Sequence, residues 1–235
     1  MKISYLCEEQ NPNNMKIGII VAMDSEYERL SELIGPSGRL GRNTVILSKS
    51  GIGKVNSALG TDRMIREHHP DCILSTGVAG GLGEGIDVMD VVAGIRMTYH
   101  DTWCGEDNAY GQVQGLPLYF EAHPALVSCV ETLRNTPGAP WIHCGLICSG
   151  DRFIADSEEE EAILGHFPEA VAVDMESCSI AQVCHLEGVP FISLRVISDS
   201  LKGNRGESYA DFWATVGTTS FSAVRQFLES LPDKL

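Results

Sequence analysis

The 235-residue chain is poor in basic residues and lacks long apolar runs. It has 17 Lys and Arg against 32 Asp and Glu, for a formal net charge of -15 at pH 7. No basic stripe interrupts this acidic surplus, so nucleic acids and anionic membranes are poor candidates as partners. No segment approaches the roughly 20 continuous apolar residues that a membrane-spanning helix needs.

Paired cysteines and a leader sequence are also missing. The eight cysteines are scattered and form no C-x-x-C pair, which argues against a zinc site and predicts free thiols in a reducing cytoplasm. Residues 1–14 show neither the apolar core nor the small-residue cleavage pattern of a signal peptide. We expect a flexible tail over residues 1–14 and one domain over residues 15–235.

The glycine-rich segments do not fit the common nucleotide-binding signatures. Thr76–Gly85 lacks the G-x-G-x-x-G spacing of dinucleotide sites, and Gly51–Val55 is too short for a P-loop and has Val55 in place of Ser or Thr. A dinucleotide enzyme and a nucleoside triphosphatase are therefore disfavoured. Thr76–Gly85 follows a predicted strand over Cys72–Ser75, and its glycines are compatible with a backbone nest that faces an anion or a ribose.

Alternating strand-like and helix-like segments predict an α/β fold. With 43% hydrophobic residues, the chain can bury one full core. The predicted strands are Ile17–Ala22, Thr44–Ser48, Ile73–Ser75, Val91–Ile95, Ile142–Ser149, Ala170–Val173 and Phe191–Ile197. Helices are predicted over Lys54–Glu67, after Glu176 as far as Gly188, and near Tyr209–Leu231. This alternation predicts a single-domain three-layer sandwich, in which helices flank a mixed, mainly parallel sheet.

Three carboxylates lie where predicted strands end. Asp199 follows Ser198 at the carboxyl end of the strand Phe191–Ile197, Glu176 follows the strand Ala170–Val173, and Glu26 lies just after the first strand. Ligands of open α/β sheets bind beyond the carboxyl ends of the strands. The three acids are therefore candidates for one site.

Helix capping is the alternative explanation for these acids. A carboxylate in the first turn of a helix complements the macrodipole by roughly 0.3–1 kcal/mol. This accounts for Glu176 taken alone, and we expect Asp24 or Ser25 to be the N-cap of the first helix. The acidic run Glu158–Glu161 has the same explanation, with Ser157 as its cap. Capping explains Asp24 better than Glu26, and the combination of three acids favours a functional site.

Eight short blocks of sequence resemble the 5'-methylthioadenosine/S-adenosylhomocysteine nucleosidases, within the wider nucleoside phosphorylase family. The blocks are MKIGIIVAMDSE, SGIGKVNSALG, STGVAGGLGEGIDVMDVV, YHD, YGQ, SGDRFI, AVDMESCSIAQVCH and PFISLRVISD. They cover most of Met15 to Phe212 in the family's order. The resemblance implies a nucleoside phosphorylase-like fold, hydrolysis of an adenine nucleoside by water, a cytoplasmic homodimer, and no metal or organic cofactor.

The resemblance also implies a role for each of the three acids. Asp199 would be the general acid that protonates the purine at N7. Glu26 would position and deprotonate the attacking water. Glu176 would accept a hydrogen bond from a ribose hydroxyl and stabilise the oxocarbenium-like sugar. One acid for the leaving group and one carboxylate for water is also the logic of glycoside hydrolysis.

A wider set of residues is assigned to the substrate by the same resemblance. Phe153 would stack on the purine, the backbone of Ile154 would read its edge, and Met175 would pack under the ribose. The full set of substrate-binding candidates is Ala22, Ile52, Val78, Gly80, Phe153, Ile154, Met175, Arg195, Ser198 and Tyr209. A core role is the alternative for Ile52 and Ile154.

The chain departs from the family in three places. Val78 replaces a Ser on the water side of the site, and its side chain cannot donate a hydrogen bond. The stretch Trp103–Gln114, which in the family lines the neighbouring subunit's pocket for the 5' substituent, contains Glu106, Asn108 and Gln114 where aromatic or Pro residues are usual. This predicts a more polar pocket that accepts a thioalkyl group less well.

The third departure, Asp174 in place of a Glu, is expected to have little effect. These departures leave alternatives open. One is a related purine nucleosidase or phosphorylase whose substrate has a more polar 5' substituent, such as an aminofutalosine-like compound or adenosine. The other is a nucleoside-binding protein that has lost catalysis, because a fold alone does not establish an activity.

Overall fold

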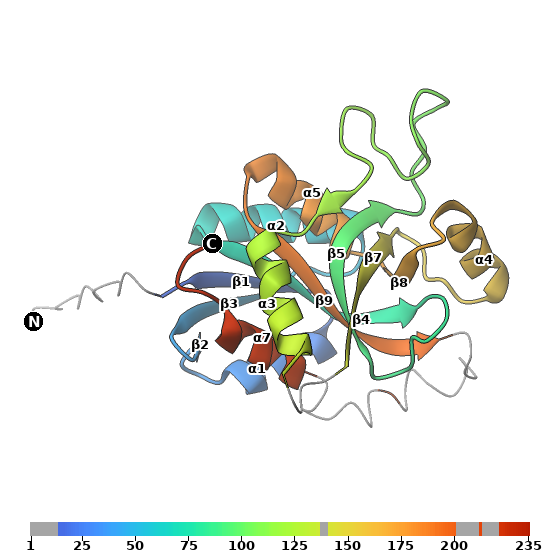
Figure 1. Ribbon diagram of the computed structural model, residues 1–235. Helices are drawn as coiled ribbons and strands as arrows, with labels where there is room; N and C mark the ends of the chain where they lie inside the picture. Colours follow the sequence, from blue (N-terminus) through green and yellow to red (C-terminus); the bar gives the residue numbers. More distant parts are fainter. Residues whose placement is uncertain (1–13, 137–140, 201–211, 213–220) are drawn as a thin grey trace, which may run out of the picture.

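The computed structural model describes residues 14–136, 141–200, 212 and 221–235. Within them a nine-stranded mixed sheet carries helices on both faces (Figure 1). The strands are β1 (Lys16–Val21), β2 (Arg39–Leu40), β3 (Asn43–Lys49), β4 (Cys72–Gly81), β5 (Val91–Tyr99), β6 (Phe120–Glu121), β7 (Ile142–Ser149), β8 (Ala170–Asp174) and β9 (Phe191–Ser200). The helices are α1 (Asp24–Ile34), α2 (Lys54–His68), α3 (Pro124–Arg134), α4 (Ser157–His166), α5 (Ser177–Glu187) and α7 (Ser222–Ser230).

Part of the sheet closes on itself. The strand order is β2-β3-β1-β4-β8-β7-β5-β6, and β9 pairs with both β4 and β5. Strands β4, β8, β7, β5 and β9 therefore form a closed circuit. Neighbours run parallel in the pairs β1–β3, β1–β4, β4–β9, β5–β7 and β7–β8, which confirms the prediction of a mixed, mainly parallel sheet.

Two apolar layers hold the helices against the sheet. On β1, Ile17, Ile19 and Val21 enter the cluster that contains the buried side chains of α1, α3 and α7. Ile20 points the other way, into the cluster shared with α2 and α5. This alternation follows from the two-residue period of a strand, and Figure 1 shows the two groups of helices on opposite faces. The result is the predicted sandwich of three layers.

Strand β4 differs from the prediction, because it continues through the glycine-rich segment to Gly81. The predicted end of this strand at Ser75 is therefore wrong, because Thr76–Gly81 belongs to the strand. Gly77 has a φ of +144°, and a Cβ there would lie 2.2 Å from Oε1 of Glu26. Glycine at this position lets the strand pass directly against the Glu26 carboxylate.

Two predicted helix caps are also wrong. The N-cap of α1 is Met23, rather than Asp24 or Ser25. The N-cap of α4 is Asp156, whose side chain accepts a hydrogen bond from the backbone N–H of Glu159, so that Ser157 becomes the first helical residue. Of the helix predicted near residues 209–231, the segment Ser222–Ser230 is described and helical.

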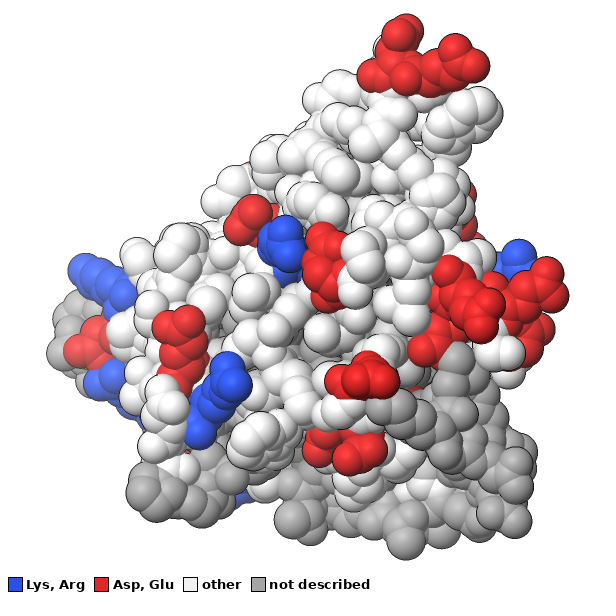
Figure 2. All heavy atoms as spheres, turned by 45° about the vertical axis from the view of Figure 1, so that its right-hand side comes forward, with Lys and Arg blue, Asp and Glu red and all other residues white. Residues whose placement is uncertain are grey.

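A long segment between β5 and β6 projects from the body of the protein (Figure 1). It includes residues 100–119, and its tip carries acidic side chains (Figure 2). Across the described residues, we find no helix that is long and apolar enough to cross a lipid bilayer.

Candidate active site

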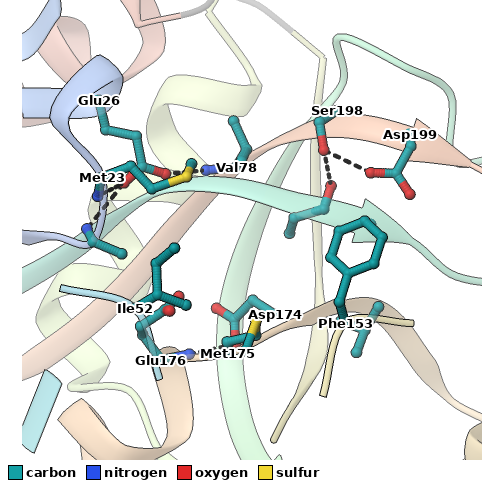
Figure 3. A pocket seen from close by; sticks show the side chains of 14 residues that line it. Met23, Glu26, Ile52, Val78, Phe153, Asp174, Met175, Glu176, Ser198 and Asp199 are labelled. Atoms are coloured by element: carbon teal, nitrogen blue, oxygen red, sulfur yellow. Dashed lines mark hydrogen bonds between the residues drawn. The ribbon is translucent and has the colours of Figure 1, made fainter. Parts of the chain in front are cut away.

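One cavity collects residues from six parts of the chain. They come from the turn after β1, the loop before α2, the end of β4, the segment after β7, and the ends of β8 and β9 (Figure 3). The lining residues are Ala22, Met23, Glu26, Ile52, Val78, Ala79, Gly80, Phe153, Val173, Asp174, Met175, Glu176, Ser198 and Asp199. All three predicted acids are among them.

The closed part of the sheet explains why these ends meet. Strand β8 runs antiparallel to β4 and pairs only with its last residues, Gly80 with Val173 and Gly81 with Ala172. Strand β9 runs parallel to β4 and brings Asp199 opposite Gly80. The carboxyl ends of β4, β8 and β9 therefore converge on one point.

Glu26 is fixed by backbone donors on both carboxylate oxygens. Its Oε2 accepts hydrogen bonds of 2.9 Å from the N–H groups of both Ala22 and Met23, and its Oε1 accepts one of 3.0 Å from that of Val78. Burial raises the pKa of the Glu26 carboxyl, against the lowering effect of Arg195 and of the three N–H donors. Glu26 both caps α1 and faces the cavity.

Glu176 occupies the N-cap position of α5, but its side chain makes no capping bond to that helix. Its Oε1 accepts a 2.9 Å hydrogen bond from the N–H of Gly53, in the loop before α2. Burial is the main cause that raises the pKa of Glu176 to about 7; Arg195 opposes the shift, and the Asp174 and Glu26 carboxylates add to it. The helix-dipole explanation does not account for this orientation.

The buried guanidinium of Arg195 pairs with two cavity carboxylates, those of Asp174 and Glu176. Nε of Arg195 is 2.9 Å from Oδ2 of Asp174, and Nη2 of Arg195 is 3.9 Å from Oε2 of Glu176. Ser177 donates to Asp174, and Arg195 donates to Ser75 and Ser177. Buried charges are tolerated when they are paired and hydrogen-bonded in this way. We call Glu26, Asp174, Glu176, Ser177 and Arg195 the floor of the site.

Asp199 stands on the other side of the cavity, at the end of β9 (Figure 3). Ser198 donates a 2.7 Å hydrogen bond to Oδ1 of Asp199, which orients the carboxyl group. The same hydroxyl also lies 3.3 Å from the backbone oxygen of Ala79. Asp199 is 9% exposed, so it meets the cavity from a largely enclosed position.

Two large apolar side chains stand open to solvent beside the buried acids. Ile52 is 49% exposed and Phe153 is 64% exposed, although both line the cavity. We call these two residues the rim of the site. Large exposed apolar groups at a concave site are surfaces available to a ligand.

The structure places most of the predicted substrate residues at the cavity. Those that line it are Ala22, Ile52, Val78, Gly80, Phe153, Met175 and Ser198. Ile154 is buried in a core cluster and lines an adjoining recess with Phe153 and Asp199. Tyr209 lies outside the described residues.

Arg195 differs from the sequence-based expectation, and Asp174 lines the cavity although it was not among the predicted site residues. Arg195 is 1% exposed and does not line the cavity, because its guanidinium is directed to Asp174, Ser75 and Ser177. A direct contact of Arg195 with substrate is therefore not supported. Asp174 is the partner of Arg195 and lines the cavity, and the small effect expected of Asp in place of Glu at this position stays a prediction. The motif Asp174-Met175-Glu176, which places Asp174 two residues before a predicted site acid, was the sequence signal that could have identified Asp174.

Three further lining residues were not anticipated: Met23, Ala79 and Val173. Each is apolar and lies at a strand end or in a strand. Sequence pattern alone does not distinguish such a residue from an ordinary core residue.

Comparison with known proteins agrees with this geometry. A family model described as the phosphorylase superfamily matches residues 16–229. A 5'-methylthioadenosine/S-adenosylhomocysteine nucleosidase of Exiguobacterium sp. is 41% identical over 226 residues, which cover 89% of this chain and 96% of the relative.

Solved structures show the same relationship. The nucleosidase of Neisseria meningitidis, in complex with methylthio-immucillin-A, is 37% identical with a TM-score of 0.84, and the match covers 92% of this chain and 100% of that one. The Colwellia psychrerythraea enzyme, in complex with adenine, is 29% identical with a TM-score of 0.83, covering 94% and 97%. The chain therefore belongs to the 5'-methylthioadenosine/S-adenosylhomocysteine nucleosidase family of the phosphorylase superfamily.

Proposed function

We propose that this protein is an N-glycosidase that hydrolyses 5'-methylthioadenosine, S-adenosylhomocysteine or both, releasing adenine and a 5-thioribose derivative. The observation that carries the proposal is the convergence of Glu26, Glu176 and Asp199 on one cavity with exposed apolar surface beside it. A pure binding protein has no need of a general acid and a water-activating base in the same pocket.

We assign protonation of the leaving group to Asp199. Phe153 and Asp199 both line the recess next to the main cavity, which suits a purine ring stacked on Phe153. A proton from Asp199 to N7 of that purine turns adenine into a neutral leaving group. General acid catalysis of this kind typically contributes about 10²–10⁴ in rate.

We assign the role of nucleophile to water, and its activation to Glu26. The raised pKa of Glu26 makes its carboxylate a better proton acceptor than an exposed glutamate. The three backbone N–H donors hold the carboxylate in one orientation, so it needs no reorganisation when water binds. Glu26 therefore suits the role of general base.

We assign the contacts with the ribose to Glu176 and Met175. Glu176 faces the cavity from the floor, and its second oxygen lies 3.9 Å from Arg195. A carboxylate there accepts a hydrogen bond from a ribose hydroxyl and stabilises positive charge that develops on the sugar. Electrostatic stabilisation in a shielded site is usually the largest single contribution to catalysis.

Water is favoured over phosphate by the charges around the cavity. Among the described residues that line it, none is Lys or Arg, and four are acids: Glu26, Asp174, Glu176 and Asp199. The guanidinium of Arg195 is already paired with Asp174. The Val78 side chain offers no donor, and its N–H is given to Glu26. A phosphate ion would meet negative charge with few donors, which disfavours phosphorolysis.

We further propose a cytoplasmic homodimer that takes part in methionine salvage. Exposed apolar residues on and before α2 support the dimer, with Val55 69% exposed and Leu59 50% exposed one helical turn apart, next to Ile52. In this arrangement the projecting segment, with Glu106 and Asn108, would line the partner's 5' pocket. Sedimentation analysis of wild type and Leu59→Glu tests the dimer, and a wild-type monomer would contradict it.

The reaction itself is tested by adenine release from methylthioadenosine, adenosylhomocysteine and adenosine, each with and without phosphate. Chromatography then identifies the base and the sugar. We expect adenine and a free thioribose derivative at the same rate with or without phosphate. Phosphate dependence would identify a phosphorylase. Preference for adenosine would support the alternative of a more polar 5' substituent, and binding without turnover would indicate a catalytically silent protein.

A further inference from the structure

A second charged cluster lies beside the site, where three loops meet. Nζ of Lys54 is 2.9 Å and 2.8 Å from the two carboxylate oxygens of Asp101, and Oδ2 of Asp101 also accepts a 2.8 Å hydrogen bond from the N–H of Asp151. Oδ1 of Asp151 accepts a 2.7 Å hydrogen bond from the N–H of Lys54. The three residues thus form a closed set of contacts.

Interactions within helix α2 do not explain why a lysine stands at position 54. It is the first residue of α2, where the positive end of the helix dipole disfavours a cation. The N-cap, Gly53, has no side chain, and Asp151 takes the place of a capping side chain although it lies 97 residues away in sequence. Contacts to other loops therefore account for these residue types better than local helix stability does.

Gly53 connects this cluster to the floor of the site. Its N–H donates to Glu176, while the next N–H, of Lys54, donates to Asp151. Gly53 has a φ of +92°, and a Cβ there would lie 2.7 Å from Oδ1 of Asp151. The start of α2 therefore holds two carboxylates at once, one in the site and one in the segment that leads to Phe153.

The cluster is partly shielded from water. The side chains of Lys54 and Asp101 are 26% and 25% exposed, and the Lys54 ammonium lies 5.3 Å from the centroid of the Tyr99 ring. An exposed ion pair contributes little to stability. The value of this pair lies instead in geometry, because it ties segments that are 47 and 97 residues apart in sequence.

We propose that Lys54, Asp101 and Asp151 are positioning residues that lock the segment bearing Phe153 to the loop bearing Ile52 and Gly53. None of the three lines the main cavity. They act through Phe153, which is assigned to adenine; the Gly53 N–H that holds Glu176 is a backbone donor that the substitutions tested below leave in place. The inference rests on the proposed function, since it assumes that adenine binds against Phe153.

The test compares Lys54→Met, Asp101→Asn and the double variant with wild type. Each single change should weaken adenine affinity and raise KM about tenfold, with kcat changed by less than about threefold. Both changes open the same set of contacts. The adenine affinity of the double variant should therefore fall about tenfold, rather than about a hundredfold. Lys54→Arg keeps the charge and should recover most of the affinity.

Asp62→Asn is the matched control. Asp62 pairs with Arg66 at 2.7 Å on the same helix, without contact to the loops at residues 101 or 151. This variant should retain wild-type adenine affinity and KM. Calorimetry with adenine reports binding without turnover, and thermal melting identifies variants that have lost stability.

Three results would overturn the inference. If wild type turns over and binds adenine but Lys54→Met and Asp101→Asn keep its affinity and KM, the positioning role is wrong and the proposed function stands. If the two losses multiply in the double variant, the residues do not act as one cluster. If wild type neither binds adenine nor releases it from any nucleoside, the proposed function fails and this inference fails with it.

Discussion

The floor and the rim of the site are built in opposite ways. On the floor, Arg195 is 1% exposed and every charge has a partner within the protein. At the rim, Phe153 is 64% exposed and offers an apolar surface to solvent. Both regions face the same cavity.

This difference separates two tasks. The buried carboxylates of Glu26 and Glu176 are held by backbone N–H groups and have raised pKa values, which suits proton transfer and charge stabilisation. An exposed aromatic ring gains by being covered, which suits the capture of a flat base. Changes on the floor should therefore affect folding and turnover, and changes at the rim should affect binding alone.

The largest expected effect is on the floor, from Arg195→Met. Removing the guanidinium leaves Asp174 and Glu176 as buried acids without their cation, which typically costs on the order of 3–5 kcal/mol of folding stability. Urea unfolding measures the change. Arg66→Met, in an exposed pair on α2, is the control and should change stability by less than about 1 kcal/mol. Equal effects of the two substitutions would contradict a structural role for the floor.

Glu26→Gln should be the next most damaging. The amide keeps the size of the carboxylate, but it has one acceptor oxygen for three N–H donors and cannot act as a base. We expect adenine release to fall by at least about 10². We also expect stability to fall by about 1–3 kcal/mol, because a buried N–H loses its acceptor. Steady-state kinetics and urea unfolding measure the two losses, and full turnover would exclude Glu26 as the base.

A pH effect on stability should follow from Glu176. Its pKa in the folded protein, about 7, lies above its ordinary value of 4.5, so the folded state binds this proton more tightly. The resulting stabilisation is fully present below about pH 4.5 and is lost as the pH rises through 7. Between pH 5 and 8 the loss should be on the order of 2 kcal/mol.

Thermal melting of wild type and Glu176→Gln across this range measures that loss. The variant has no titrating group at this position, so its stability should decline less steeply, while Glu26 still titrates in both proteins. Parallel curves for the two proteins would show that Glu176 does not carry the effect.

The smallest expected effect belongs to the rim. Phe153→Ala should raise KM and weaken adenine binding about tenfold through loss of stacking, or about 1.4 kcal/mol. Stability should change by less than about 0.5 kcal/mol, because the ring is exposed. Trp141→Ala removes another exposed aromatic, away from the described lining of the cavity, and should leave adenine binding unchanged. A loss of folding in Phe153→Ala would remove the distinction between floor and rim.

The strand pattern was predictable from the sequence because apolar, β-branched runs mark buried strands. β7 has the predicted bounds, and β1 and β3 differ from prediction by one residue at each end. The full length of β4 was not predictable, because glycine ordinarily weakens a strand. Here close contact with Glu26 requires Gly77, and that contact depends on tertiary structure.

The sequence predicted that the acids meet because each follows a strand, but this reason is incomplete. Asp199 and Glu176 do lie at strand ends, but β8 runs antiparallel to β4, so they do not share an edge of a simple parallel sheet. The closure through β9 brings them together. The burial of Arg195 with Asp174 could not be inferred either, since the two residues are 21 positions apart and a charged pair has no sequence period.

The most direct test of the central claim, that Asp199 protonates the leaving adenine, is to measure adenine release and adenine affinity for wild type and Asp199→Asn in parallel. Asparagine preserves the shape of the side chain and removes the transferable proton. We predict that turnover falls by about 10²–10⁴ while folding and adenine affinity stay within a few-fold of wild type. Unchanged turnover in Asp199→Asn would contradict the mechanism.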